Sequence, residues 1–333
     1  MNYIGSKYRL AEFIEQSIQE VVGSFEGTTM AELFGGTGII ARKLKTKVKR
    51  VIVNDLEPYS YTLLKNYIEN TQPIAQGKEL IEQLNELPLV KGFIYQHYCA
   101  GSGSGRMYFS DENGQKIDAI RQQIEEWKKA QYIDGATYYF LLASLLESAD
   151  KVANTASVYG AFLKQLKKSA LNPLKLISAD FAITQQTNGV YNIDANELVK
   201  QPEIQGDILY LDPPYNARQY GANYHMLNTI ALYDEFEPKG KTGLREYNRS
   251  VYCQKAKVAT AFESLIAQAR FRYIFVSYNN EGLMSKEEVK TILSKYGSYD
   301  LKTTHYQRFK ADKTENRNHK ASATEEYLHI LVK

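Results

Sequence analysis

The fold of this chain is decided by a stretch near its start, MAELFGGTGIIARKL, residues 30–44. An apolar strand over 30–34 runs directly into a glycine-rich turn, and an apolar segment that begins at Ile39 follows the turn. The next apolar run, Val51 to Asp55, indicates a second buried strand, and a helix from about residue 58 to 70 comes after it. Strand, turn, helix and strand in this order form a βαβ unit, so we predict an α/β fold with a parallel sheet.

The patterns on either side of this unit predict one domain with a long insertion. Apolar residues at helical spacing indicate a helix over 7–22. Strand and helix patterns return at Ile208, and two strand-like runs close the chain as a predicted hairpin, 299–309 with 327–332. We therefore expect a domain built from two segments of the chain, residues 1–75 and 200–333.

Residues 76–199, between those segments, lack the strand and helix alternation, and their apolar residues recur mostly at helical spacing. Within this block, the segment 100–114 is rich in glycine and serine, which makes it flexible by composition. We interpret the block as a mostly helical inserted lobe. A structural cap on the sheet is the alternative.

The composition excludes several classes of protein. With 44% hydrophobic and 24% charged residues among 333, the chain is neither disordered nor fibrous. It has no apolar run long enough to span a bilayer, its start lacks a secretory signal, and its 2 cysteines give no disulfide framework. We expect a cytoplasmic protein that does not bind membranes.

Charge alone does not identify a partner, because the net charge is only +3. Basic residues crowd the stretch from Arg42 to Arg50, and lysines gather again at positions 164, 167 and 168. Such runs are usually a solvated face. The 26 tyrosines could stack on nucleic-acid bases, although many will simply be core.

The glycine turn predicts a cofactor site. Residues 36–41, GTGIIA, fit the pattern G-x-G-x-x-A, and Asp55 ends the next strand, where a carboxylate can bind ribose hydroxyls. Ligands of parallel sheets bind beyond the carboxyl ends of the strands. The pattern favours a nucleoside cofactor, with a nicotinamide-dependent dehydrogenase as one candidate, over a purely structural turn in which Asp55 caps a helix.

A second motif, Asp212-Pro213-Pro214-Tyr215, ends the strand that runs to Leu211 and reaches the same edge of the sheet. The prolines stiffen the turn and leave carbonyl groups without a helical donor. The result is a rigid set of acceptors beside an aromatic ring, which suits an exocyclic amine on a planar base. A proline turn with Asp212 as a helix cap is the structural alternative.

These motifs resemble those of one enzyme family. Asp212 to Tyr215 matches the D-P-P-Y motif of DNA N6-adenine methyltransferases, Phe34 to Gly38 matches their F-x-G-x-G, and Asn2 to Lys7 looks like their N-terminal cofactor segment. The motif order is that of the group that includes Dam methylases and restriction-modification methylases. The resemblance implies a Rossmann-like, S-adenosylmethionine-dependent methyltransferase fold whose inserted block is the target-recognition region.

The resemblance also implies roles for individual residues. The expected contacts of S-adenosylmethionine are Tyr3, Lys7, Phe34, Gly36, Gly38, Asp55 and, more loosely, Asp194. The catalytic motif is Asp212, Pro213, Pro214 and Tyr215, in which Asp212 and the Pro213 carbonyl would bind the target amine and Tyr215 would stack on the base. The expected contacts of double-stranded DNA are Arg106, Lys164, Lys167, Lys168, Arg218 and Tyr220.

The implied reaction moves a methyl group to N6 of an adenine flipped out of a specific duplex sequence, as in bacterial restriction-modification systems. A separately encoded restriction endonuclease is a candidate partner. We expect no metal, because His97 and Cys99 are a single pair of candidate ligands and no second pair follows at a suitable spacing. The alternatives are an NAD-dependent dehydrogenase, a methyltransferase for cytosine N4, RNA or protein glutamine, and a DNA-binding module without catalysis.

Overall fold

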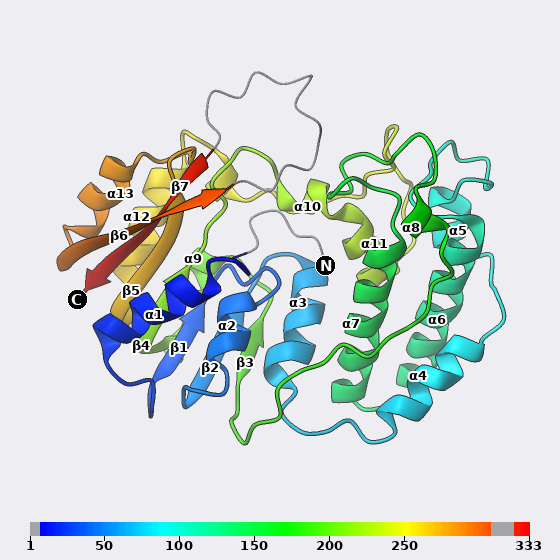
Figure 1. Ribbon diagram of the computed structural model, residues 1–333, viewed down its shortest axis with the longest axis horizontal. Coiled ribbons are helices and arrows are strands. Elements are labelled where there is room, and N and C mark those ends of the chain that lie inside the picture. Colours follow the sequence, from blue (N-terminus) through cyan, green and yellow to red (C-terminus); the bar gives the residue numbers. More distant parts are fainter. Residues whose placement is uncertain (1–6, 308–322) are drawn as a thin grey trace. The chain divides into compact units, whose positions relative to one another are not determined.

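The computed structural model describes residues 7–307 and 323–333, in two compact units (Figure 1). The expected cofactor residue Tyr3 and the loop of the terminal hairpin lie outside the described residues. We call the first unit the sheet unit, composed of Lys7–Leu56, Gln186–Gln219 and Arg249–Lys333. We call the second the helical unit, whose described parts are Glu57–Gln185 and Tyr220–Asn248.

The sheet unit contains a seven-stranded sheet in the order β3-β2-β1-β4-β5-β7-β6. The first five strands in this order are parallel, and β7 runs antiparallel to both β5 and β6. The predicted parallel sheet and terminal hairpin are therefore confirmed. The strands are β1 (Thr29–Glu32), β2 (Arg50–Asn54), β3 (Gly189–Tyr191), β4 (Gln205–Leu211), β5 (Arg270–Asn279), β6 (Ser298–Gln307) and β7 (Ala323–Val332).

The register brings the two sequence motifs to one edge of this sheet. Met30 of β1 pairs with Val51 of β2 on one side and with Ile208 of β4 on the other. Because all three strands are parallel, their carboxyl ends lie together, and the glycine turn and the D-P-P-Y motif each follow one of those ends.

Helices cover both faces of the sheet (Figure 1). On one face, a continuous apolar core joins the strands to α9 (Ala195–Leu198), α12 (Val258–Gln268) and α13 (Lys286–Leu293). A 3₁₀ turn, η2 (Val251–Cys253), contributes Tyr252 to the same core. On the other face lie α1 (Ala11–Val22) and α2 (Ile39–Leu44), which realise the helices predicted there.

The basic run between Arg42 and Arg50 has a structural role in this arrangement. Lys43 Nζ lies 2.9 Å from Glu12 Oε2 and 2.8 Å from Glu15 Oε2, so α2 is tied to α1 by ion pairs. Lys47 also pairs with Glu15. Lys47 and Lys49 are exposed, as expected of a solvated face, whereas Lys45 of the same run is fully buried.

In the described part of the helical unit, all the named elements are helices, and none of the strands of the sheet lies in this unit. Its longest helices, α6 (Asp111–Lys129) and α7 (Gly135–Val152), lie within the block predicted to be mostly helical. The predicted helix over 58–70 changes into a π-helix at Lys65. The elements are α3 (Pro58–Leu64), η1 (Lys65–Glu69), α4 (Gly77–Glu86), α5 (Phe93–Tyr98), α6 (Asp111–Lys129), α7 (Gly135–Val152), α8 (Lys168–Leu171), α10 (Tyr220–Asn223) and α11 (His225–Leu232).

The boundaries of the two units differ from the expected ones at 75/76 and 199/200. The helix after β2 belongs to the helical unit, as does the segment Tyr220–Asn248 that follows the D-P-P-Y motif. Conversely, β3 belongs to the sheet, where Gly189 pairs with Ile52. A strand of three residues has too short a pattern to be recognised inside a helical stretch of sequence.

The glycine-rich segment 100–114 is anchored rather than uniformly flexible. Tyr108 and Phe109 are fully buried, Tyr108 N donates to Tyr98 O at 2.9 Å, and its hydroxyl donates to Tyr159 O at 2.7 Å. Ser110 then caps α6 by accepting from Asn113 N. Composition misses these contacts because their partners lie elsewhere in the sequence.

Within the described ranges 7–307 and 323–333, none of the helices combines the length and the apolar character that a membrane-spanning helix needs.

Candidate active site

The glycine turn connects β1 to α2 in a conformation that requires glycine. Gly36 has φ 52° and Gly38, the N-cap of α2, has φ 68°, both in the left-handed region that side chains disfavour. Gly35 N donates to Asn54 O at 2.8 Å, and Gly38 N donates to Gly35 O at 2.7 Å. These bonds fix the turn against the end of β2.

Asp55 joins this turn directly. Its Oδ2 accepts a hydrogen bond from Gly36 N at 2.7 Å, and its own carbonyl accepts from Asn192 Nδ2 at 2.7 Å. The carboxylate is half-buried and therefore within reach of solvent. It buttresses the turn, and this position is also compatible with the expected contact to a ribose.

Asp194 follows β3 and caps α9, accepting from Asn196 N at 2.8 Å. Tyr252 links this cap to the glycine turn, because its ring packs edge-on against Phe34 at 4.8 Å and its hydroxyl donates to Asn196 Oδ1 at 2.7 Å. The structure thus brings Phe34 and the Asp194 cap together through a residue that the sequence motifs do not contain.

Asp212 lies at the end of β4 and forms an ion pair with Lys7. The Lys7 Nζ atom is 3.1 Å from Asp212 Oδ1 and 3.8 Å from Glu326 Oε2. The side chain of Lys7 is only 6% exposed and that of Asp212 is 18% exposed. The resemblance predicts Lys7 as a cofactor contact, whereas its contacts in the structure are with the motif acid and with β7.

Tyr215 completes this group. Lys7 Nζ lies 5.6 Å from the centroid of its ring, and its backbone carbonyl accepts from Leu283 N at 3.0 Å. Its ring is half-buried, so part of it remains accessible. The two prolines between Asp212 and Tyr215 fix the spacing of carboxylate and ring.

Burial and neighbouring charge set the ionisation of these groups. Burial raises the pKa of Asp212 to about 6; Lys7 opposes this shift, and Glu326 adds to it. Burial alone would lower the pKa of Lys7, but the carboxylates of Asp212 and Glu326 outweigh it and hold that pKa above its ordinary value. At neutral pH the pair is therefore an ammonium and a carboxylate.

Two acids near this group were missed by the sequence motifs. Glu32 ends β1, is 3% exposed and accepts from Ala41 N at 2.9 Å; burial keeps its pKa well above the ordinary value. Glu326 comes from β7, and burial raises its pKa as well. The available signal was a carboxylate placed within each of two apolar strands.

The expected DNA contacts fall into two groups. Arg106 donates to the carbonyls of His97, Pro238 and Gly240, at 3.2, 3.3 and 3.0 Å. Lys167 Nζ donates to Thr155 O at 2.7 Å. Both cations therefore support backbone inside the helical unit.

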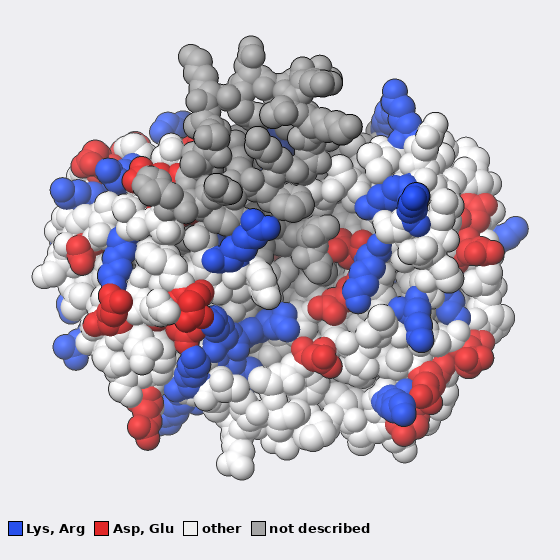
Figure 2. Space-filling model, viewed as in Figure 1, with Lys and Arg blue, Asp and Glu red and all other residues white. Residues whose placement is uncertain are grey.

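The remaining candidates are more accessible. Lys164, Lys168 and Arg218 are exposed, and Tyr220 stacks on Tyr224 with ring centroids 6.1 Å apart. On the described part of the face in Figure 2, basic and acidic side chains are interspersed rather than gathered into one basic area.

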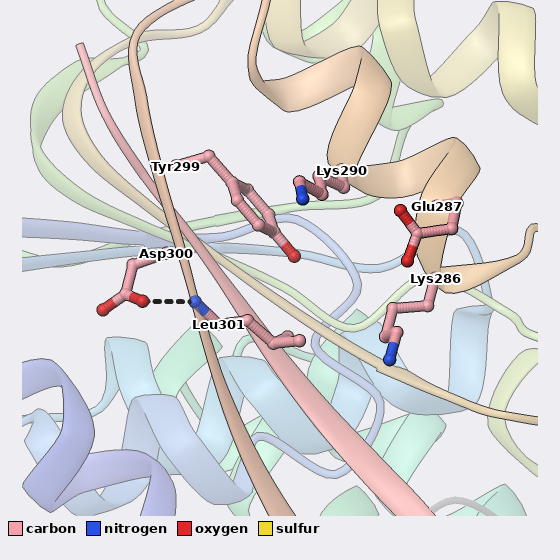
Figure 3. A pocket seen from close by; sticks show the side chains of 6 residues that line it. All are labelled: Lys286, Glu287, Lys290, Tyr299, Asp300 and Leu301. Atoms are coloured by element: carbon pink, nitrogen blue, oxygen red, sulfur yellow. Dashed lines mark hydrogen bonds between the residues drawn. The ribbon is translucent and has the colours of Figure 1, made fainter.

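An open pocket of the sheet unit lies between α13 and β6 (Figure 3). None of the predicted site residues lines it, and its charges are mixed. Among the residues that the structure describes, no group of three His, Cys, Asp or Glu side chains is placed to hold a metal ion. The lining residues are Lys286, Glu287, Lys290, Tyr299, Asp300 and Leu301.

Comparison with known proteins supports the interpretation of the motifs. The type II methyltransferase M.NlaIII of Neisseria lactamica is 65% identical over 334 residues, covering 100% of this chain and 99% of the relative. M.CviAII of Paramecium bursaria Chlorella virus 1, also a type II methyltransferase, is 39% identical over 316 residues, covering 93% of each chain. The type II methyltransferase M.FokI of Planomicrobium okeanokoites is 40% identical over 351 residues; the match covers 100% of this chain but 53% of M.FokI.

The family match covers residues 3–292, which include the glycine turn and the D-P-P-Y motif. It overturns the dehydrogenase alternative and selects adenine in DNA over the other amines considered above. The chain belongs to the family of D12 class N6 adenine-specific DNA methyltransferases.

Proposed function

We propose that this adenine-specific DNA methyltransferase uses S-adenosylmethionine to methylate N6 of an adenine extruded from a specific duplex sequence. The observation that carries the proposal is the Asp212 carboxylate, fixed by two prolines at the same sheet edge as the glycine turn and ion-paired with Lys7 at 3.1 Å. The type II methyltransferases to which the chain is similar support a role as the modification enzyme of a restriction-modification system.

The residues at the glycine turn suit a nucleoside cofactor. Left-handed Gly36 and Gly38 let a ligand approach the backbone, and the half-buried Asp55 offers a carboxylate beside them. Phe34 would supply an apolar wall, and Asp194 an acceptor near the adenine of the cofactor. When bound, S-adenosylmethionine supplies an electrophilic methyl group attached to a sulfonium sulfur. After transfer, that sulfur is a neutral thioether.

The D-P-P-Y motif would activate the target amine. The lone pair of an adenine N6 is delocalised into the ring, so the amine is a weak nucleophile. Asp212 and the Pro213 carbonyl would accept hydrogen bonds from its two N–H groups and favour a tetrahedral nitrogen with a free lone pair. Tyr215 would stack on the base, and the N6 nitrogen would lose a proton to solvent after the new C–N bond has formed.

The helical unit would then be the target-recognition region, with boundaries 57–185 and 220–248 in place of the expected 76–199. Its exposed cations, Lys164 and Lys168, would contact phosphates, together with Arg218 of the sheet unit. Arg106 and Lys167 would act indirectly, because their donors already support backbone carbonyls.

The test is direct. The protein is incubated with radiolabelled S-adenosylmethionine and DNA from cells without adenine methylation, and the DNA is digested to nucleosides. We expect the label in N6-methyldeoxyadenosine; label in methylcytosine, or no transfer, would contradict the proposal. Sequencing of DNA from cells that express the protein, by a method that detects N6-methyladenine, identifies the target sequence.

Asp212→Ala tests the acceptor. We expect loss of transfer by about 100-fold or more, because a fixed electrostatic contact to the reacting group is removed. Binding of S-adenosylmethionine, measured by calorimetry, should largely survive. An active Asp212→Ala variant would show that another group binds the amine.

A further inference from the structure

Glu326 is an acid of the site that lies outside the D-P-P-Y motif, near the end of the chain. It sits on β7 opposite Asn279 of β5 and is 9% exposed. Its Oε2 lies 3.8 Å from Lys7 Nζ, beyond hydrogen-bond distance, and accepts no hydrogen bond from the residues that the structure describes. The Asn279 side chain forms a hydrogen bond with the Glu326 carboxylate, but the buried Oε2 atom itself lacks a donor. A buried carboxylate oxygen without a donor is costly, so its retention there calls for an explanation.

The explanation lies in the ammonium that faces it. Lys7 Nζ is 3.1 Å from Asp212 and 3.8 Å from Glu326, so one buried cation serves two carboxylates. If Lys7 served Asp212 alone, it would compete with an incoming amine for the same carboxylate. The negative charge of a second carboxylate partly offsets the positive potential of Lys7 at Asp212 and so weakens that competition.

We propose that Glu326 is a positioning residue for methyl transfer: it shares the Lys7 ammonium with Asp212, so that Lys7 orients the motif carboxylate yet leaves it a strong acceptor. The inference rests on the proposed role of Asp212 as the group that binds the target amine. Glu326 touches neither substrate in this scheme and acts through Lys7.

The scheme makes a prediction about ionisation. Removal of the Glu326 charge takes a negative charge away from Asp212 and leaves Lys7 to pair with it alone, so the pKa of Asp212 should fall below about 6. Removal of the Lys7 charge should raise that pKa. Other titratable groups near this cluster, which the variants leave unchanged, are Glu32 on β1, Tyr210 on β4, Tyr215 and Glu281, which acts on Glu326.

The test compares Glu326→Gln and Lys7→Gln with the natural protein. Two quantities are measured: the pH dependence of single-turnover methyl transfer to unmethylated genomic DNA, and the titration of the Asp212 carboxyl by ¹³C NMR in the protein without ligands. Glu326→Gln should move the acid limb and the NMR midpoint down by about 0.5–1 pH unit, and Lys7→Gln should move both up. The ratio of rates at pH 5.5 and pH 8 should rise about two- to threefold in Glu326→Gln.

A matched control is Glu325→Gln, the preceding residue, whose Oε2 accepts from the Tyr327 hydroxyl at 2.8 Å. Since neighbouring residues of a strand face opposite sides of the sheet, this variant should leave both midpoints in place. If Glu326→Gln does not fold, Glu326→Asp, which withdraws the carboxylate by one methylene, should shift both midpoints down by less.

The outcomes separate the two proposals. Unchanged or raised midpoints in Glu326→Gln, with a uniform loss of rate at every pH, mean that Glu326 only stabilises the fold and overturn the inference. In that case an inactive Asp212→Ala variant would leave the proposed function standing. An active Asp212→Ala variant would instead remove the basis of both.

Discussion

The two units of this protein use buried charge in different ways. In the helical unit, the fully buried Asp118 accepts hydrogen bonds from the backbone N–H groups of Gly92, Ile94 and Tyr95, at 3.0, 2.9 and 2.8 Å. It also accepts from the Tyr233 hydroxyl at 2.6 Å. In the sheet unit, Asp212 faces an ammonium and a second acid at the end of a strand.

The cations differ in the same manner. Arg121 of the helical unit is 3% exposed and donates to the carbonyls of Ile230 and Ala231 at 3.1 and 3.2 Å, near the end of α11, as well as to Glu125 Oε2 at 2.9 Å. Lys7 of the sheet unit lies against two carboxylates, those of Asp212 and Glu326. A buried charge satisfied by backbone groups holds a fold together, whereas one satisfied by other charges can exchange a partner for a ligand.

This contrast predicts its largest effect at Asp118. Asp118→Ala leaves the N–H groups of Ile94 and Tyr95 at the start of α5 without their acceptor, whereas Gly92 N keeps its bond to Val90 O at 3.1 Å. We expect the free energy of unfolding to fall by about 3–5 kcal/mol. Urea unfolding measures this change. Asp212→Ala should change the unfolding free energy far less, because it removes a buried carboxylate while Glu326 remains to face Lys7.

Asp118→Asn is the conservative control, since its amide oxygen can still accept from part of the helix start. A loss of stability at Asp212 equal to that at Asp118 would break the distinction between the two units. So would an Asp118→Ala variant with full stability.

A smaller effect is expected at Tyr215, where the sheet unit offers a ring rather than a charge. Tyr215→Ala should reduce kcat/KM for DNA about 10- to 100-fold, since stacking on a base contributes about 1–3 kcal/mol. Tyr215→Phe should keep most of the activity, and Tyr215→Asp should be worse than Tyr215→Ala. If Tyr215→Phe lost as much activity as Tyr215→Ala, the hydroxyl rather than the ring would be required, and the stacking role would be contradicted.

The same contrast explains what the sequence revealed. The glycine turn, Asp55 and the D-P-P-Y motif are each encoded by adjacent residues, and the βαβ order alone places them at one edge of the sheet. Glu326 depends instead on the register of β7 against β5, a long-range pairing that no local pattern specifies. The N-terminal motif contains Lys7, but the pairing of Lys7 with Asp212 depends on the fold and is not evident from the sequence.

The roles of the basic residues in the helical unit could not be predicted for a related reason. Its helices follow from apolar spacing, but the use of its cations depends on the carbonyls that come near them. Arg106 is an example, because it stands in a glycine-rich segment that predicts a mobile basic contact. Its guanidinium instead donates to the carbonyls of Pro238 and Gly240, which lie 132 and 134 residues further along the chain.

The smallest effect is expected within the helical unit, where two exposed lysines can be compared with Arg106. Lys164 and Lys168 are exposed, whereas the donors of Arg106 are engaged with carbonyls. If the two lysines contact phosphates, Lys164→Gln with Lys168→Gln should lower the slope of log K for DNA against log salt by about 2, without loss of stability. Arg106→Gln should instead lower the free energy of unfolding and leave that slope nearly unchanged. Fluorescence anisotropy over a series of salt concentrations measures the slope, and a reversed result would mean that Arg106, not the exposed pair of lysines, contacts DNA.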